Sequence, residues 1–200
     1  GLNTGGMGAY SPAPILNENV LNKTVETIIR PTMREMVRRG MPFTGVLYAG
    51  LMIKDSDPRL VEYNVRFGDP ECQVLMMRLG GQILDALLST AEGKLSDVKI
   101  NWADDHSITV VMASNGYPGS YEKGTEIVGL ANLPSNNNFM CFHAGTEEKN
   151  GKIVATGGRV LNITTRAETL IKAQKNAYEM IETIDWPEGF YRKDIGWRAL

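Results

Sequence analysis

The chain has 200 residues, of which 42% are hydrophobic and 22% are charged, so it can bury a core without disulfides or structural metals. Its formal net charge of −2 provides no long-range field that would attract nucleic acid or an anionic membrane surface, and neither partner is expected. The sequence contains no apolar run of the ~20 residues needed to span a bilayer and no secretory signal at its N-terminus.

A glycine cluster opens the chain, with four glycines among residues 1–8 and two prolines, Pro12 and Pro14, directly after them. Such a segment cannot pack a core, so we expect a functional loop with an extended exit. Clustered glycines expose backbone N–H groups that can line an anion site, although a plain turn explains them equally well. A chain that begins inside such a loop is expected to be a fragment of a longer one.

An amphipathic helix is predicted from Leu21, because apolar residues recur at intervals of three and four as far as Val37. Pro31 should kink or interrupt this helix, and Gly40 followed by Pro42 should end it.

Two strands are predicted next. Residues 46–53 are almost entirely apolar, and residues 60–66 alternate, with Val61, Tyr63 and Val65 on a face that we expect to be buried beneath a helix. A second helix should follow Pro70, with a buried stripe formed by Val74, Leu75, Leu79, Ile83, Leu84, Leu87 and Leu88.

The composition shifts near Gly93, where we place a boundary between a first portion, residues 1–92, and a β-rich subdomain, residues 93–200. The second portion should form a small sandwich or barrel and end in a helix that begins near residue 167. Its predicted strands are residues 107–113, 139–143, 152–156 and 159–164. The fold class is therefore α+β with antiparallel sheets.

Glu62, Asn64 and Arg66 form the most informative pattern, because three polar side chains share one face of an otherwise apolar strand. A carboxylate beside an amide oxygen suits Mg²⁺ or Mn²⁺, and Mg²⁺ commonly takes further ligands from nucleotide phosphates. Arg66 can pair with a phosphate or carboxylate anion. The same pattern is also typical of the solvated outer face of a sheet, so the residues alone leave both interpretations open.

Nucleophilic catalysis finds little support, because neither cysteine nor any serine has a convincing base partner. Cys72 and Cys141 lie far apart in apolar segments, which favours reduced thiols in a cytoplasmic protein over a disulfide. His143 is expected in the core of a strand, and His106 in a surface loop.

Four motifs cover the chain from end to end. They are Asn-Thr-Gly-Gly-Met-Gly-Ala-Tyr-Ser-Pro at residues 3–12, Arg-Phe-Gly-Asp-Pro-Glu at 66–71, Gly-Gly-Arg-Val at 157–160 and Tyr-Arg-Lys-Asp-Ile-Gly-Trp-Arg-Ala at 191–199. Together they closely resemble the phosphoribosylamine–glycine ligase (glycinamide ribonucleotide synthetase) family, and the second motif is highly specific.

The resemblance implies an ATP-grasp ligase that joins glycine to 5-phosphoribosylamine through a glycyl phosphate, with ATP cleaved to ADP and phosphate. It implies that Glu62 and Asn64 bind the metal, which favours that interpretation of the polar face, and we expect Arg66 to be catalytic at an anion. The chain would be the C-terminal part of the enzyme, with the substrate domain and most of the lid upstream and the active site incomplete.

Further substrate-binding residues are expected in the same two motifs. Asn3, Thr4, Gly5 and Gly6 are candidates for binding the glycine or phosphoribosyl end of the substrates. Asp69 and Glu71 could orient the amine, and Asp69 could instead cap the helix that starts at Pro70.

Two other functions remain open. One is another ATP-grasp ligase with a different substrate, such as a carboxylase. The other is a non-catalytic carrier module of the lipoyl or biotinyl kind, which needs an exposed lysine at a hairpin tip. Lys152 lies near a turn, but without the expected neighbours.

Overall fold

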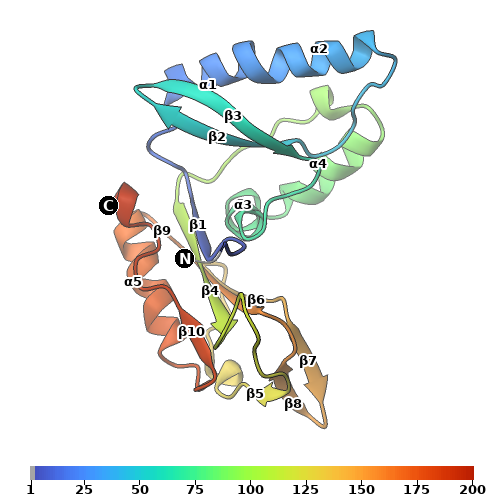
Figure 1. Ribbon diagram of the computed structural model, residues 1–200. Helices are drawn as coiled ribbons and strands as arrows, with labels where there is room; N and C mark the ends of the chain where they lie inside the picture. The colour runs from blue at the N-terminus through green and yellow to red at the C-terminus, as the bar shows by residue number, and fades with distance from the viewer. Residues whose placement is uncertain (1–2) are drawn as a thin grey trace.

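A computed structural model describes residues 3–200 as two joined parts, a helix-covered hairpin above a helix-covered sheet (Figure 1). The chain contains both helices and strands, and every strand pair is antiparallel. The predicted α+β class is therefore confirmed.

The first helical segment is continuous across Pro31. It comprises α1 (Glu18–Thr24), a π-helical turn (Val25–Ile29) and α2 (Arg30–Arg38), and it starts at Asn17, whose side chain accepts a hydrogen bond from the Val20 amide. A π turn is wider than an α turn, so it accommodates a proline that cannot donate a backbone hydrogen bond. The hydrogen-bonding pattern changes just before Pro31, but the rod in Figure 1 continues through it, so the predicted interruption is wrong.

Strands β2 (Tyr48–Lys54) and β3 (Asp57–Asn64) form a two-stranded hairpin beneath this rod. The Tyr63 hydroxyl lies 2.8 Å from that of Thr32, so this face of β3 does meet the helix. However, Val61 is 65% exposed and Val65 71% exposed, so the predicted burial of these two residues is wrong. The helix covers the hairpin around Tyr63, and Val65 already lies beyond the end of the strand.

The predicted second helix is two helices, α3 (Glu71–Leu79) and α4 (Gln82–Ala91). Gly80 separates them with φ 57° and ψ −142°, a conformation that is essentially restricted to glycine. The axis changes direction there, so a single buried stripe is impossible and that prediction is wrong. Val74 and Leu79 are buried, whereas three later leucines are exposed: Leu84, Leu87 and Leu88.

The second part is built on a five-stranded sheet between two helices. Its strands are β1 (Gly8–Ser11), β4 (His106–Ser114), β9 (Arg159–Ala167) and β6 (Phe139–His143) in that order, with β10 (Gly189–Tyr191) also paired to β4. Helix α5 (Leu170–Ile181) packs on one face and α3 on the other. The core between α5 and the sheet includes Ile108, Val110, Leu161, Ala173 and Ile181.

A smaller sheet of β5 (Thr125–Glu126), β8 (Lys152–Ala155) and β7 (Thr146–Lys149) projects at the foot of the molecule (Figure 1). Asn150 and Gly151 both have positive φ, which suits the two-residue turn between β7 and β8. The β-rich portion therefore contains two separate antiparallel sheets.

The glycine-rich opening is only partly a loop, because residues 8–11 form β1 and pair with residues 107–110 of β4. The first strand of the chain thus belongs to the sheet of the second part. Our division at residues 92 and 93 remains a proposal, and this pairing crosses it.

The two histidines lie opposite to expectation. His143 is exposed because it is the last residue of the edge strand β6, and its Nδ1 lies 2.9 Å from the Thr146 hydroxyl. His106 is half-buried at the start of β4, rather than in a surface loop. Both cysteines are free, and burial raises the pKa of Cys141 to about 11, so this thiol stays protonated near neutral pH.

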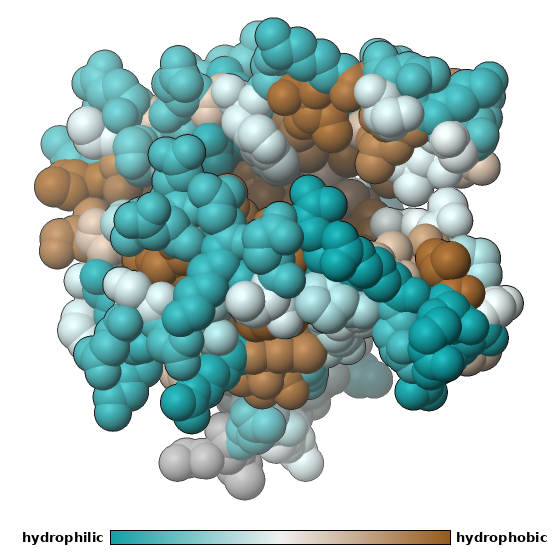
Figure 2. Space-filling view, turned by 90° about the horizontal axis from the view of Figure 1, so that it is seen from above, coloured by the Kyte–Doolittle hydropathy of each residue, from teal (hydrophilic) through white to brown (hydrophobic). Residues whose placement is uncertain are grey.

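Hydrophilic side chains cover much of the face seen in Figure 2, with apolar residues visible between them. Within residues 3–200, no helix combines the length and the apolar character required to cross a membrane.

Candidate functional site

A cleft of about 520 Å³ brings together segments that are far apart in the chain. The end of β3, the turn before α3, the opening glycines and the start of β9 all contribute to it. Its lining residues are Gly5, Gly6, Tyr48, Glu62, Asn64, Arg66, Phe67, Gly68, Asp69, Glu71 and Arg159.

Glu62, Asn64 and Arg66 form one hydrogen-bonded row in this cleft. The Asn64 amide nitrogen donates to Glu62 Oε1 at 3.0 Å, and an Arg66 guanidinium nitrogen lies 3.4 Å from Asn64 Oδ1. Arg66 also donates to the carbonyl of Phe67 at 2.7 Å, which holds its side chain along the cleft wall. The alternation of β3 therefore places these side chains together, and Arg66 lies two residues past the strand.

The donor set of this row fits a hard divalent cation. Glu62 retains a free second oxygen, and Asn64 offers its amide oxygen once the long contact from Arg66 is released. No cluster of three or more histidine, cysteine, aspartate or glutamate side chains with metal-binding geometry occurs between residues 3 and 200. Two oxygens suit Mg²⁺ or Mn²⁺ if bound phosphate and water complete the shell.

Glu71 begins α3 and borders the same cleft, where the Tyr48 hydroxyl donates to its Oε1 at 3.1 Å. Burial, followed by the nearby charge of Glu71, raises the pKa of Tyr48 to about 12, so this hydroxyl remains a donor. Gly68 makes the arrangement possible, because a Cβ at that position would collide with the Glu71 carboxylate. The pair fixes the direction of the Glu71 carboxylate.

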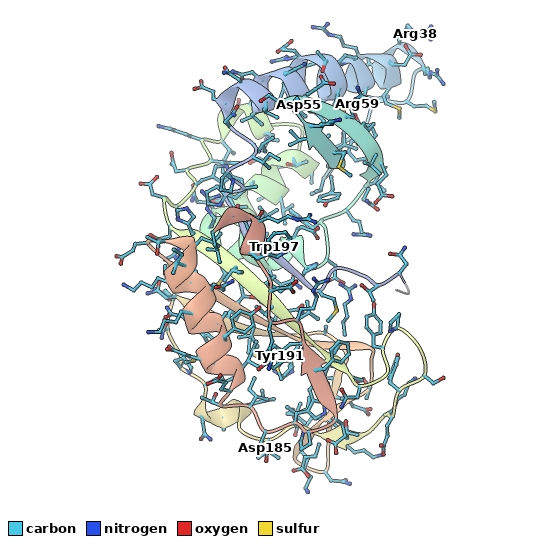
Figure 3. All side chains as sticks on the ribbon, turned by 60° about the vertical axis from the view of Figure 1, so that its left-hand side comes forward. Arg38, Asp55, Arg59, Asp185, Tyr191 and Trp197 are labelled. Atoms are coloured by element: carbon cyan, nitrogen blue, oxygen red, sulfur yellow. The ribbon has the colours of Figure 1, made fainter. Side chains whose placement is uncertain are left out.

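Glu71 also borders a second cavity, of about 410 Å³, which residues 8–10 of β1 line as well. Its rim is the turn from Arg192 to Arg198, which includes the exposed Trp197 (Figure 3). Glu71 therefore lines both the cleft and the second cavity.

Asp69 does not cap α3, because no side chain caps the start of that helix. Its carboxylate instead pairs with Arg159 at 2.7 Å, and the guanidinium also donates to the backbone carbonyls of Asp69 and Gly6. The capping alternative is wrong because Arg159 draws the carboxylate toward the sheet.

The predicted site residues divide into two groups. The first group lines the cleft and consists of Glu62, Asn64, Arg66, Gly5, Gly6, Asp69 and Glu71. The second group, Asn3 and Thr4, does not line it. The sequence reasoning missed Tyr48, Arg159 and Tyr117, whose hydroxyl accepts a hydrogen bond from the Gly5 amide at 3.0 Å. Arg159 was part of a motif used for the family resemblance, but neither tyrosine stood out, because their roles depend on contacts across the fold.

Two family models match the chain. The one described as "Phosphoribosylglycinamide synthetase, ATP-grasp (A) domain" matches residues 1–72, and the one described as "Phosphoribosylglycinamide synthetase, C domain" matches residues 107–198. The Glu62–Asn64–Arg66 row lies within the first match, and Tyr117 and Arg159 lie within the second.

Known relatives match the chain over almost its whole length. A phosphoribosylamine–glycine ligase of Brucella melitensis is 54% identical over the whole chain, and the chain covers 47% of it. The crystal structure of phosphoribosylamine–glycine ligase from Thermotoga maritima superposes with a TM-score of 0.85 at 36% identity, covering 97% of this chain and 47% of that one. A biotin carboxylase from Campylobacter jejuni, at 18% identity and a TM-score of 0.60, covers 94% of this chain and 41% of that one, and shares the fold.

The chain thus spans about half the length of the curated relatives it matches. Both family models, the relatives and the motifs agree along its length, so the chain belongs to the phosphoribosylglycinamide synthetase family and comprises ATP-grasp and C-domain sequence.

Proposed function

We propose that the protein containing this chain is an ATP-dependent ligase that joins glycine to 5-phosphoribosylamine, giving glycinamide ribonucleotide, ADP and phosphate. The observation that carries the proposal is the Glu62–Asn64 oxygen pair beside Arg66, in a cleft formed by the family's own motifs. The upstream substrate and lid domains of the same enzyme would complete the site, and ATP would be a substrate.

Amide formation needs activation, because a carboxylate is a poor electrophile. Glycine would first become a glycyl phosphate at the expense of ATP, and the amine of phosphoribosylamine would then displace phosphate. Neither step requires a nucleophile from the protein, in keeping with the protonated thiol of Cys141. The main obstacle is the approach of two anions, which positive charge in the cleft reduces.

Each cleft residue has a role in that chemistry. Glu62 and Asn64 would hold Mg²⁺ or Mn²⁺, which when bound neutralises phosphate charge. Arg66 would bind a phosphate or carboxylate oxygen, and Glu71, oriented by Tyr48, would orient the attacking amine. The backbone of Gly5 and Gly6 would border the substrate. Two free thiols favour the cytoplasm as the compartment.

The carrier alternative receives no support from Lys152. This lysine does follow the hairpin turn of β7 and β8, but its amino group pairs with Glu126 at 2.6 Å instead of standing free for covalent attachment. An intact mass without a lipoyl or biotinyl adduct would exclude that function.

The test of the metal pair is Glu62→Gln in the full-length enzyme. The amide keeps the shape but removes the negative charge that holds the cation, so we expect the rate at low Mg²⁺ to fall by about 10²-fold and to recover partly at high Mg²⁺. Asn64→Ala should have a milder effect, because water can replace a neutral oxygen ligand. The measurement is glycine-dependent ADP release against Mg²⁺ concentration.

Glu168→Gln is the matched control, since this exposed glutamate pairs with Lys172 outside the cleft and its loss should leave the rate unchanged. If Glu62→Gln kept a near-native rate at low Mg²⁺, the metal assignment would be wrong and Glu62 would belong to the solvated outer face of a sheet. Release of ADP that depends on bicarbonate instead of glycine would favour a carboxylase.

A further inference from the structure

Two side chains of the second part hold the glycine loop of the first. Arg159, at the start of β9, donates from Nη1 to the carbonyl oxygens of Gly6 at 3.0 Å and Asp69 at 2.9 Å. Its Nη2 donates to the Asp69 carboxylate at 2.7 Å. Tyr117, in the loop after β4, accepts a hydrogen bond from the Gly5 amide at 3.0 Å. The loops at residues 5–6 and at residue 69 are therefore both bound to the C-domain portion.

The fit at Arg159 is close. The guanidinium lies against the backbone of Gly5, where an added Cβ would come within 2.8 Å of Arg159 Cζ. The Arg159 side chain is only 22% exposed, whereas the Asp69 carboxylate that it holds is 53% exposed, so the guanidinium is the shielded partner of the pair. A lysine could keep the ion pair, but its single ammonium group could not reproduce the planar fork that reaches two carbonyls and a carboxylate.

The fit at Tyr117 depends on a second glycine. A Cβ at Gly158 would collide with the Tyr117 ring, so this glycine leaves room for the ring directly before Arg159. Tyr121 packs edge-on against the same ring, at 6.5 Å between centroids, and limits its movement. The hydroxyl of Tyr117 is thus directed at the Gly5 amide by packing on two sides.

We propose that Arg159 and Tyr117 are positioning residues, by which the C-domain portion fixes Gly5, Gly6 and Asp69 in the geometry that the cleft requires. They act through the backbone of the two loops and not on the reacting atoms. Because Gly5, Gly6 and Asp69 face Glu62 and Arg66 across the same cleft, releasing them would widen the space in which substrates must meet. The kinetic consequence rests on the proposed ligase function; the structural consequence does not.

Hydrogen exchange in the full-length protein tests the structural consequence. Tyr117→Phe removes the acceptor of the Gly5 amide, and we expect residues 3–10 to exchange about tenfold faster while β9 and α5 stay unchanged. Arg159→Met should accelerate exchange in residues 66–71 as well. Tyr121→Phe is the matched control, because the structure of residues 3–200 gives its hydroxyl no hydrogen bond. Arg38→Met, at the far end of α2, controls for loss of an arginine (Figure 3).

Kinetics test the positioning role. Arg159→Met should lower kcat by about 10²-fold with KM for glycine and ATP changed less than about threefold, and Arg159→Lys should recover part of the loss. Tyr117→Phe should lower kcat by about tenfold. Native exchange in both variants, or a raised KM with unchanged kcat, would overturn the proposal. Faster exchange in a protein that shows no ligase activity would instead reject the proposed function and leave the structural role in place.

Discussion

The hydroxyl of Tyr48 is held protonated by its surroundings. Its pKa is raised to about 12 from an ordinary value of 10, first by burial and then by the charge of Glu71. Because the folded state binds this proton more tightly than the unfolded state does, the resulting stabilisation is complete below pH 10 and is lost as the pH rises through about 12.

We expect Tyr48→Phe to remove one tyrosinate transition, the one near pH 12, from a spectroscopic titration of the full-length protein. If the proposed ligase function holds, the variant should also bind the amine substrate less well, since Glu71 loses its only side-chain donor within the described residues. Tyr121→Phe, which removes a tyrosine that does not line the cleft, serves as the control. If Tyr48→Phe removed a transition near pH 10, the hydroxyl would be solvated and the Glu71 contact absent.

At this scale the sequence predicted what lies close in the chain. The two-residue period of β3 was sufficient to place Glu62 and Asn64 together, and Arg66, two residues past the strand, extends the same row. Arg159 and Tyr117 could not be assigned in the same way, because their partners are 153 and 112 residues distant and are reached only through the pairing of strands. Local periodicity carries no information about such contacts.

Among the elements, the junction of α3 and α4 offers a matched pair of glycines. Gly80 has φ 57° and ψ −142°, whereas Gly81 has φ −62° and ψ −16°, and no neighbouring atom lies within 4 Å of an added Cβ at either position. The two sites therefore differ in backbone conformation and not in space.

We expect Gly80→Ala to destabilise the protein by about 1–3 kcal/mol, because the Cβ of alanine makes these backbone angles sterically unfavourable. Gly81→Ala should be neutral or stabilising by up to about 1 kcal/mol, because alanine adopts that helical conformation readily and restricts the unfolded chain. Urea unfolding of each variant measures both effects. Equal destabilisation by the two substitutions would mean that the junction does not have this geometry.

Longer elements were easier to predict than short ones. The strands β4, β6, β8 and β9 and helix α5 have sustained patterns that the sequence displays. In contrast, β5 and β10 have only two and three residues, and β1 forms because β4 offers it a free edge. The exposure of Val61 and Val65 was missed for a related reason, since periodicity gives the face of a strand but not what covers it.

At the scale of the whole molecule, β1 unites the two parts. A fragment of residues 93–200 would lose its partner for residues 107–110 of β4 and expose unpaired backbone groups. The fragment also loses α3 from one face of the sheet. We therefore expect it to be less stable than the same residues in the intact chain by more than the roughly 2–4 kcal/mol that the lost backbone hydrogen bonds alone would cost, at roughly 1 kcal/mol each.

A synthetic peptide of residues 3–13 should raise the melting temperature of that fragment, by roughly 5 °C for each kcal/mol recovered. A peptide of the same composition in scrambled order should not. If the fragment had the melting temperature of the intact chain, and the peptide did not change it, residue 93 would start an independent domain.

The bond between Gly6 and Arg159 also sets an order in time. A ribosome delivers the opening loop 153 residues before the arginine that fixes it, and β1 long before β4. Closing so large a loop is slow, and local contacts do not offset the loss of chain entropy that it requires. The nascent chain must therefore carry its glycine loop unfastened while these 153 residues are made, and the cleft is complete only after β9 has emerged and paired with β4.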